Sequence, residues 1–337
     1  MKYSVLSKYR SELMGVAMLW VMAFHAFDLS FGVAPLDFLR AAGFGGVDIF
    51  ILVSAMGLAM SLDKKEQEYA SFMSRRAARI LPAYYLVMVA YTLFCIVREK
   101  ALWSTLIWNG SLLYYWIRPQ GAFNWYVAGI MLFYALTPWC FRMLKVSAHR
   151  ERLVAFEVCL ALLVCQLLMQ DGYWFHLDIP YRFPVFFMGL LLGLYVRSDR
   201  AISWKGAAFW TFWMAAGGCY LVATQKLSGH GVALPLCHLF VFTTVPMCLV
   251  LCWCFARLPL GMLRRGLRVV GEHSLEIYLL NVSFFAETAL LQQYLDFGPG
   301  HYIYYAITIP LNLVLGVLLH HGMQAGQTLL ARRAAAK

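Results

Sequence analysis

Long apolar runs separated by short polar segments make up most of this chain. About ten runs approach the ~20 residues that a helix needs to cross the hydrocarbon core of a membrane. They cover about residues 11–30, 44–62, 80–98, 124–141, 153–169, 182–196, 207–223, 233–256, 271–290 and 302–323. One further segment, about 103–117, is short and rich in Trp and Tyr, which favours an interfacial or re-entrant position. The pattern predicts an all-α, polytopic membrane helix bundle that forms a single domain over residues 1–337.

Composition and charge narrow the class of protein further. Hydrophobic residues make up 62% of the 337 residues and charged residues only 13%, which excludes an ordinary soluble domain and indicates membrane lipids as surroundings. The 28 Lys and Arg exceed the 17 Asp and Glu, and most of the excess lies in short loops, where positive charge sets membrane orientation. We therefore expect both termini in the cytoplasm and no nucleic-acid partner. The nine cysteines lack metal-ligand spacing, so we expect no metal and no bound cofactor.

Two ionisable residues are expected at similar depth in the first hydrophobic hairpin. His25 lies about one turn before the end of the outgoing run, and Asp48 about one turn into the returning run. A neutral imidazole can take a proton from a hydroxyl, and a nearby carboxylate can orient it. Because ionisable groups are costly in hydrocarbon, this pair is a candidate site. The alternative is a membrane histidine bonded to a backbone carbonyl.

A basic run opens the third apolar segment. Arg75, Arg76 and Arg79 precede Pro82, which suits a helix break at this point. Guanidinium groups bind phosphates in a bidentate manner, so a nucleotide-like or coenzyme A donor could dock here. Plain anchoring by positive charge explains the same residues.

Three further polar positions lie near the ends of apolar runs. Arg182 is on the expected outer side, where it could bind an acidic or sugar acceptor or form an ordinary ion pair. Glu276 lies near the cytoplasmic side, where snorkelling or pairing with Arg268 is the leading interpretation. We interpret His320 and His321 as structural.

Several short motifs follow one another in an order that resembles a known family. Along the chain they are Phe24-His25, Gly46-Val47-Asp48-Ile49-Phe50 with Ser54, Arg75-Arg76 with Arg79-Ile80, Pro82 and Tyr84, Trp125-Tyr126, Phe133-Tyr134 with Pro138, Arg182-Phe183-Pro184 with Met188-Gly189, and Ser274-Leu275-Glu276-Ile277-Tyr278-Leu279. Over about residues 8 to 325 they resemble the membrane-bound acyltransferase 3 family. Its members O-acylate sugars of lipopolysaccharide, exopolysaccharide, peptidoglycan and related surface glycans.

The resemblance implies roles for individual residues. It implies His25 as the catalytic histidine, Asp48 as a motif carboxylate, and the arginines of the basic run as the groups that face acyl-CoA. In full, the implied acyl-CoA-binding residues are Arg75, Arg76, Arg79 and Tyr85, and the acceptor or supporting residues are Ser54, Trp125, Tyr126, Arg182, Glu276 and Asn281.

The chain departs from the family pattern at three positions. Met14 stands where the family usually has an arginine, and Arg10, one helical turn earlier, is a candidate substitute. Ala55 replaces the glycine of a Ser-Gly pair, and Asn281 stands where many members have histidine.

Together these observations predict an integral O-acyltransferase of the bacterial inner membrane. The donor would be cytoplasmic acyl-CoA, most simply acetyl-CoA, and the acceptor a hydroxyl of a cell-surface or lipid-linked glycan, with His25 as general base. Two other classes stay open. A transporter or flippase could use the same intramembrane charges as a proton relay, and a non-catalytic relative could bind a glycan without turning it over.

Overall fold

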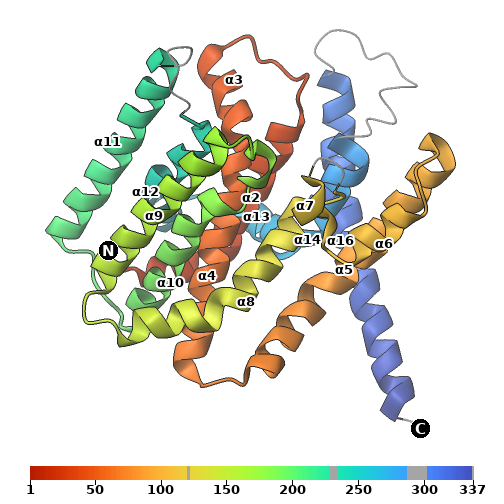
Figure 1. The fold of residues 1–337 in the computed structure, drawn as a ribbon, viewed down its shortest axis with the longest axis horizontal. Helices are drawn as coiled ribbons and strands as arrows, with labels where there is room; N and C mark the ends of the chain where they lie inside the picture. The colour runs from red at the N-terminus through yellow and green to blue at the C-terminus, as the bar shows by residue number, and fades with distance from the viewer. Residues whose placement is uncertain (120–121, 228–233, 287–301, 336–337) are drawn as a thin grey trace.

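The computed structural model describes residues 1–119, 122–227, 234–286 and 302–335, and they form helices joined by turns (Figure 1). The longer helices are α2 (Arg10–His25), α4 (Gly46–Lys64), α5 (Tyr69–Glu99), α8 (Trp125–Val146), α9 (Arg150–Gln170), α10 (Phe183–Arg197), α11 (Trp204–Leu227), α12 (Leu239–Arg257), α13 (Gly261–Glu272) and α16 (Tyr302–Ala335). The shorter ones are α1 (Ser4–Lys8), α3 (Ala34–Ala41), η1 (Ala42–Gly45), α6 (Ser104–Gly110), α7 (Tyr114–Ile117), η3 (Trp174–His176), η4 (Pro180–Arg182), η5 (Leu236–His238), α14 (Ser274–Leu280) and η6 (Asn281–Ala286). Over these residues no β-strand is present, which confirms the all-α class.

The helices follow the predicted apolar runs. Among the described residues, seven helical segments are long and apolar enough to cross a membrane. They begin at residues 34, 69, 125, 150, 204, 236 and 302. Helices α2 and α10 have 16 and 15 residues, and the apolar segment Ser274–Phe285 is also short. A multi-pass helix bundle is thus supported, whereas the number of about ten spans stays a prediction. The end of the 271–290 run lies outside the described residues.

The segment 103–117 forms two short helices, α6 and α7, and its interfacial or re-entrant position stays a prediction. It is held to α5 through backbone oxygens. The hydroxyl of Tyr84 donates to the carbonyl of Asn109 at 2.7 Å, and Tyr85 donates to the carbonyl of Gly110 at 3.1 Å. The Asn109 side chain in turn accepts from the backbone N–H of Phe123 at 2.9 Å, just before α8 begins.

The predicted helix break at Pro82 is wrong. Helix α5 runs from Tyr69 to Glu99 with Pro82 inside it. A membrane bundle tolerates proline within a helix because neighbouring groups and local adjustments satisfy the freed carbonyl. The basic run and the apolar part of α5 are therefore parts of one helix.

Small residues allow the backbones of α4 and α10 to approach closely at the centre of the bundle. A Cβ added at Gly189 or at Gly193 would lie 2.6 Å from the carbonyl oxygen of Leu52 or of Met56. The two glycines are four residues apart, so they share one face of α10. Close packing of small residues is a main source of helix association in membranes, where the hydrophobic effect offers little.

A buried carboxylate fixes α13 against α2. Glu12 is almost fully buried, and its carboxylate accepts a hydrogen bond from Arg268 at 2.8 Å and lies 3.7 Å from Arg264. The hydrogen bond and charge of Glu12 raise the pKa of Arg268. The predicted pairing of Glu276 with Arg268 is therefore wrong, because Arg268 forms its ion pair with Glu12.

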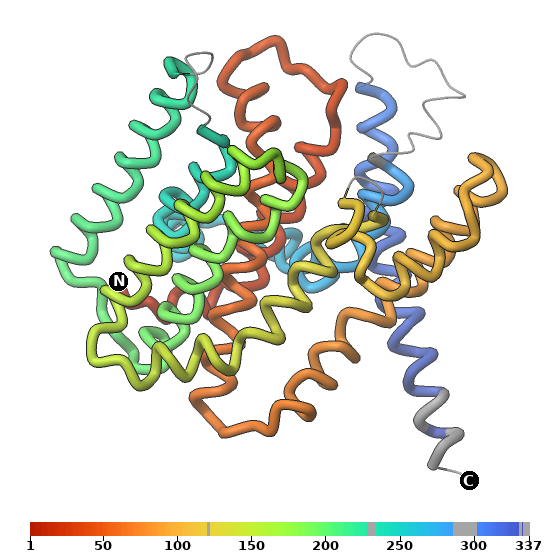
Figure 2. The backbone as a smooth tube through the Cα atoms, viewed as in Figure 1, coloured from red at the N-terminus to blue at the C-terminus, as the bar shows by residue number. Residues whose placement is uncertain are grey.

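Ion pairs tie the basic loops together at one end of the bundle. Asp63, at the end of α4, lies 3.1 Å from Lys145 of α8 and 3.4 Å from Arg197 of α10. Arg200 pairs with Glu151 at the start of α9, at 3.0 Å. Figure 2 shows α16 extending past the other helices at its C-terminal end. This gathering of charge agrees with the expected cytoplasmic side, although membrane orientation itself stays a prediction.

The α4–α10 contact makes a first prediction. Gly189→Ala should lower the free energy of unfolding by about 1–3 kcal/mol, because the new methyl group overlaps backbone atoms that cannot move aside. The matched control is Gly218→Ala on α11, where the added Cβ meets no atom within 4 Å. Unfolding in detergent micelles measures both variants. Equal stability of the two would contradict the role of this contact.

Candidate active site

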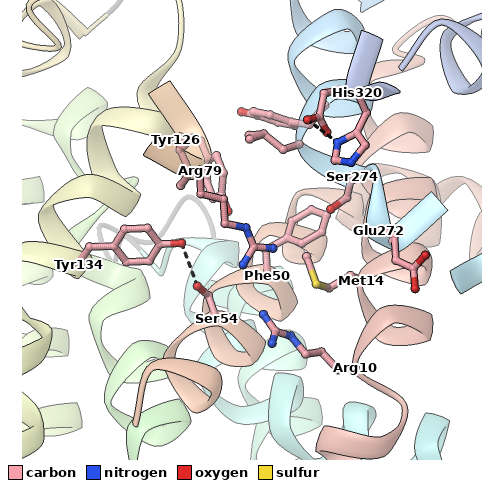
Figure 3. Close-up of a pocket in the computed structure, with 15 residues that line it drawn as sticks. Arg10, Met14, Phe50, Ser54, Arg79, Tyr126, Tyr134, Glu272, Ser274 and His320 are labelled. Atoms are coloured by element: carbon pink, nitrogen blue, oxygen red, sulfur yellow. Dashed lines mark hydrogen bonds and ion pairs between the residues drawn. The ribbon is translucent and has the colours of Figure 1, made fainter. Parts of the chain in front are cut away.

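A cavity of about 130 Å³ lies inside the bundle, lined by residues of α2, α4, α5, α8, α13, α14 and α16. We call it the arginine cavity; its polar lining includes Arg10, Ser54, Arg79, Tyr134, Glu276 and His320. Figure 3 shows the guanidinium groups of Arg10 and Arg79 reaching from opposite sides toward the space near Ser54. The hydroxyl groups of Ser54 and Tyr134 are 3.2 Å apart. Two positive charges in one enclosed space can bind an anion such as a phosphate.

Only one of the three arginines in the basic run lines this cavity. Arg79 does so. Arg75 is exposed and donates to Ser71 at 2.6 Å and to Gln67 at 2.5 Å, while Arg76 lies 5.3 Å from the ring of Phe72. Tyr85, bound to the carbonyl of Gly110, is also outside it. Arg75, Arg76 and Tyr85 thus lie outside the lining of this cavity, and their role in donor binding stays a prediction.

Arg10 occupies the place expected of a substitute for the missing arginine. Arg10 and Met14 lie on one face of α2 and both line the arginine cavity. Gly57 of α4 makes room for the long side chain, because a Cβ there would lie 3.3 Å from the Arg10 Nη1.

The sequence interpretation missed a partly buried pair in the same cavity. Glu276 lies 2.9 Å from the Nδ1 of His320, which joins α14 to α16. His273 packs against His320 and His321, with ring centroids 4.7 and 5.3 Å apart. Despite this gathering of histidines, the described part of the chain contains no group of three or more His, Cys, Asp or Glu that could hold a metal ion. His320 thus lies in the cavity wall, where its contact with Glu276 joins two helices.

A second cavity, of about 340 Å³, lies at the other end of α2. We call it the histidine cavity; its lining includes His25, Trp125, Trp174, Asp178, Arg182 and Tyr278. Trp125 comes from α8, and Tyr278 from α14. Asn124 caps α8 by accepting from the backbone N–H of Val127 at 3.0 Å, which fixes where this helix begins. Tyr278 lines both cavities.

The imidazole of His25 is held by the backbone of its own helix. Its Nδ1 lies 2.9 Å from the carbonyl oxygen of Val21, and its ring packs edge-on against Phe24 and Phe27. A carbonyl can only accept, so Nδ1 carries the proton and Nε2 keeps its lone pair in the neutral ring. The expectation that Asp48 orients this ring is corrected, because Val21 holds it instead. The bond to a backbone carbonyl therefore does not exclude a base, since it leaves Nε2 basic.

Asp48 instead binds Arg182, and both side chains are about 1% exposed. The Arg182 Nε lies 3.5 Å from Asp48 Oδ2, and its Nη1 donates to the carbonyl of Asp178 at 2.6 Å. The guanidinium also lies over the rings of Trp125 and Tyr181, at 4.5 and 4.2 Å. Trp125 and Arg182 line the histidine cavity, and Asp48, which does not line it, is joined to them through Arg182. Arg182 forms the ion pair that was one of its two expected roles.

Asn281 also lies beside His25, around a small space between α2, η6 and α16. Its side-chain oxygen accepts from Asn312 at 3.2 Å, and both asparagines are buried. Tyr126 belongs to the arginine cavity, where it packs against Tyr278. The structure therefore divides most of the predicted site residues between two cavities instead of gathering them in one.

The Asp48–Arg182 pair makes a second prediction. Asp48→Asn should lower the free energy of unfolding by about 3–5 kcal/mol, because it leaves a buried guanidinium short of countercharge. Asp63→Asn is the control; it removes a partly exposed carboxylate and should cost about 1 kcal/mol or less. Denaturant titration in micelles compares them. The double variant Asp48→Asn/Arg182→Met should recover part of the loss, and additive losses would contradict the pairing.

Comparison with known protein families gives one match, which covers most of the chain. The acyltransferase domain family, acyltransferase 3, matches the chain over residues 13–321. Neither the curated proteins nor the solved structures gave a match. The matched range includes His25, the Asp48–Arg182 pair and Arg79, and it ends just after His320. The chain therefore belongs to the acyltransferase 3 family.

Proposed function

We propose that this protein is an integral membrane O-acyltransferase that carries an acyl group from acyl-CoA to a hydroxyl of a glycan. One observation carries the proposal. A cavity with two arginines and a cavity with a basic histidine lie in the same bundle, and Tyr278 lines both. Donor and acceptor can therefore enter from opposite ends and meet between the same helices. The family supports acyl transfer as the reaction class.

The arginine cavity is the proposed donor end. Arg10 and Arg79 bind the phosphates of acyl-CoA through charge-assisted hydrogen bonds, which guanidinium groups form in pairs. Arg10 begins α2 and the basic run lies in the first turns of α5, and we assign these helix ends to the cytoplasm, the compartment that holds acyl-CoA. An acetyl group is the simplest acyl group that acyl-CoA could donate here. Both termini then lie in the cytoplasm of a bacterial cell, with the bundle in its inner membrane.

The histidine cavity is the proposed acceptor end. The His25 Nε2 takes the proton from a sugar hydroxyl, and the resulting alkoxide attacks the thioester carbonyl. The carbon–sulfur bond breaks, the new ester forms, and the thiolate of coenzyme A leaves and is protonated. The Val21 carbonyl holds Nδ1–H throughout and stabilises the imidazolium. Trp125 and Trp174 offer flat apolar faces to a sugar ring, and Asp178 offers an acceptor for its hydroxyls.

The donor assignment makes a third prediction. Arg79→Ala should raise the KM for acetyl-CoA about 10- to 100-fold with little change in kcat, because the charged contact contributes to ground-state and transition-state binding alike. Arg75→Ala is the matched control, since Arg75 lies on the same helix outside the cavity. Steady-state kinetics with purified protein in nanodiscs separate the two constants. Equal effects of the two variants would contradict a specific phosphate site.

The acceptor assignment makes a fourth prediction. His25→Ala should reduce transfer of label from radiolabelled acetyl-CoA to envelope glycans about 10²- to 10⁴-fold, the range typical of a lost general base. The exposed His149, ahead of α9, serves as control through His149→Gln. Membranes with matched protein amounts are compared. Full labelling with His25→Ala would contradict the base, and no labelling by wild type would contradict acyl transfer from this donor.

A further inference from the structure

Three aromatic rings stand where the two cavities meet. Tyr278 lines both the arginine cavity and the histidine cavity, and its side chain is 5% exposed. Its ring packs edge-on against Tyr126, with centroids 5.2 Å apart. Tyr126 in turn packs against Phe50, at 6.4 Å. The three residues come from α14, α8 and α4, so the rings form a row across the bundle.

The helices that carry these rings contribute residues to both cavities. On α4, Phe50 faces the arginine cavity, while Val47, one turn earlier, faces the histidine cavity. On α8, Tyr126 and its neighbour Trp125 divide in the same way. The boundary between the cavities therefore passes through Phe50, Tyr126 and Tyr278.

We propose that Phe50, Tyr126 and Tyr278 form a constriction that limits the size of the acyl group transferred. This inference rests on the proposed function, since it concerns the path from the donor end to His25. On the proposed path, an acyl group attached at the arginine cavity reaches His25 by passing between these rings. A short acyl group passes with a small shift of one ring, whereas each added methylene must find space in a close-packed row. The rings thus make the enzyme specific for short acyl groups.

The position of Tyr278 makes it the most informative residue to change. Tyr278→Ala removes the ring that borders both cavities, and it should raise the ratio of butyryl to acetyl transfer by about 10-fold or more, since one methylene in a tight pocket is typically worth about 10- to 200-fold. Phe50→Leu also removes a ring but leaves more side-chain bulk in the row, so it should shift the ratio in the same direction by a smaller factor. Tyr278→Phe keeps the ring and should leave the ratio at the wild-type value.

The experiment uses the full chain in nanodiscs with acetyl-CoA and butyryl-CoA competing in one reaction. The ratio of the two products is independent of how much active protein each preparation contains, so a loss of folded protein in one variant does not disturb the result. If Tyr278→Ala does not accumulate, Phe50→Leu provides the same readout. Increased ratios in the ring-removing variants with an unchanged ratio in Tyr278→Phe support the constriction.

Two results would overturn it, and they differ from each other. Unchanged ratios in both Tyr278→Ala and Phe50→Leu, with an active wild type, would show that the rings only pack the bundle. A wild type that transfers neither acyl group would overturn the proposed function, and the constriction with it.

Discussion

A guanidinium group buried within a helix bundle must be neutralised where it lies, and much of this structure follows from how Arg182 meets that requirement. Asp48 comes to it from α4, Asp178 from the turn before η4, and the rings of Trp125 and Tyr181 cover its faces. Separating these groups would leave an uncompensated buried charge, so the ion pair holds the helices that carry them at fixed positions relative to one another. The first turn of α8 is thereby fixed, and with it the aromatic residues Trp125 and Tyr126 that face the two cavities.

Close backbone packing supports the same arrangement. Gly189 and Gly193 bring α10 against α4, on the helix that also carries Asp48 and Phe50. The Glu12 carboxylate joins α2 to α13, immediately before the α14 residues that reach into both cavities. The cavities are therefore bordered by helices whose positions are set by glycine contacts and by buried ion pairs, which leaves their walls well defined.

The sequence predicted the helices better than the contacts between them. Run length and composition are local properties, so the apolar helices, the basic loops and the short 103–117 segment could be predicted. Position along the helices predicted a similar depth for His25 and Asp48. It did not predict which way each side chain faces around its helix axis, and Asp48 faces Arg182 instead of His25. The basic run likewise could not reveal that Arg79, and not Arg75, points inward. Glu276 and His320 are 44 residues apart, and only their common depth near one end of the bundle could have suggested the pair.

The positions of the two cavities also set the distance that a donor must span in this bundle. Arg10 and His25 lie at opposite ends of α2, roughly 22 Å apart at 1.5 Å per residue. A donor held by its phosphates at Arg10 and Arg79 must therefore extend along α2 before its thioester meets the imidazole. On the proposed path the rings of Phe50, Tyr126 and Tyr278 lie between these points, where they would separate a thioester in the arginine cavity from water in the histidine cavity. The same rings would then slow hydrolysis of the thioester while no acceptor is bound, so selection by size and protection from water would have one structural cause.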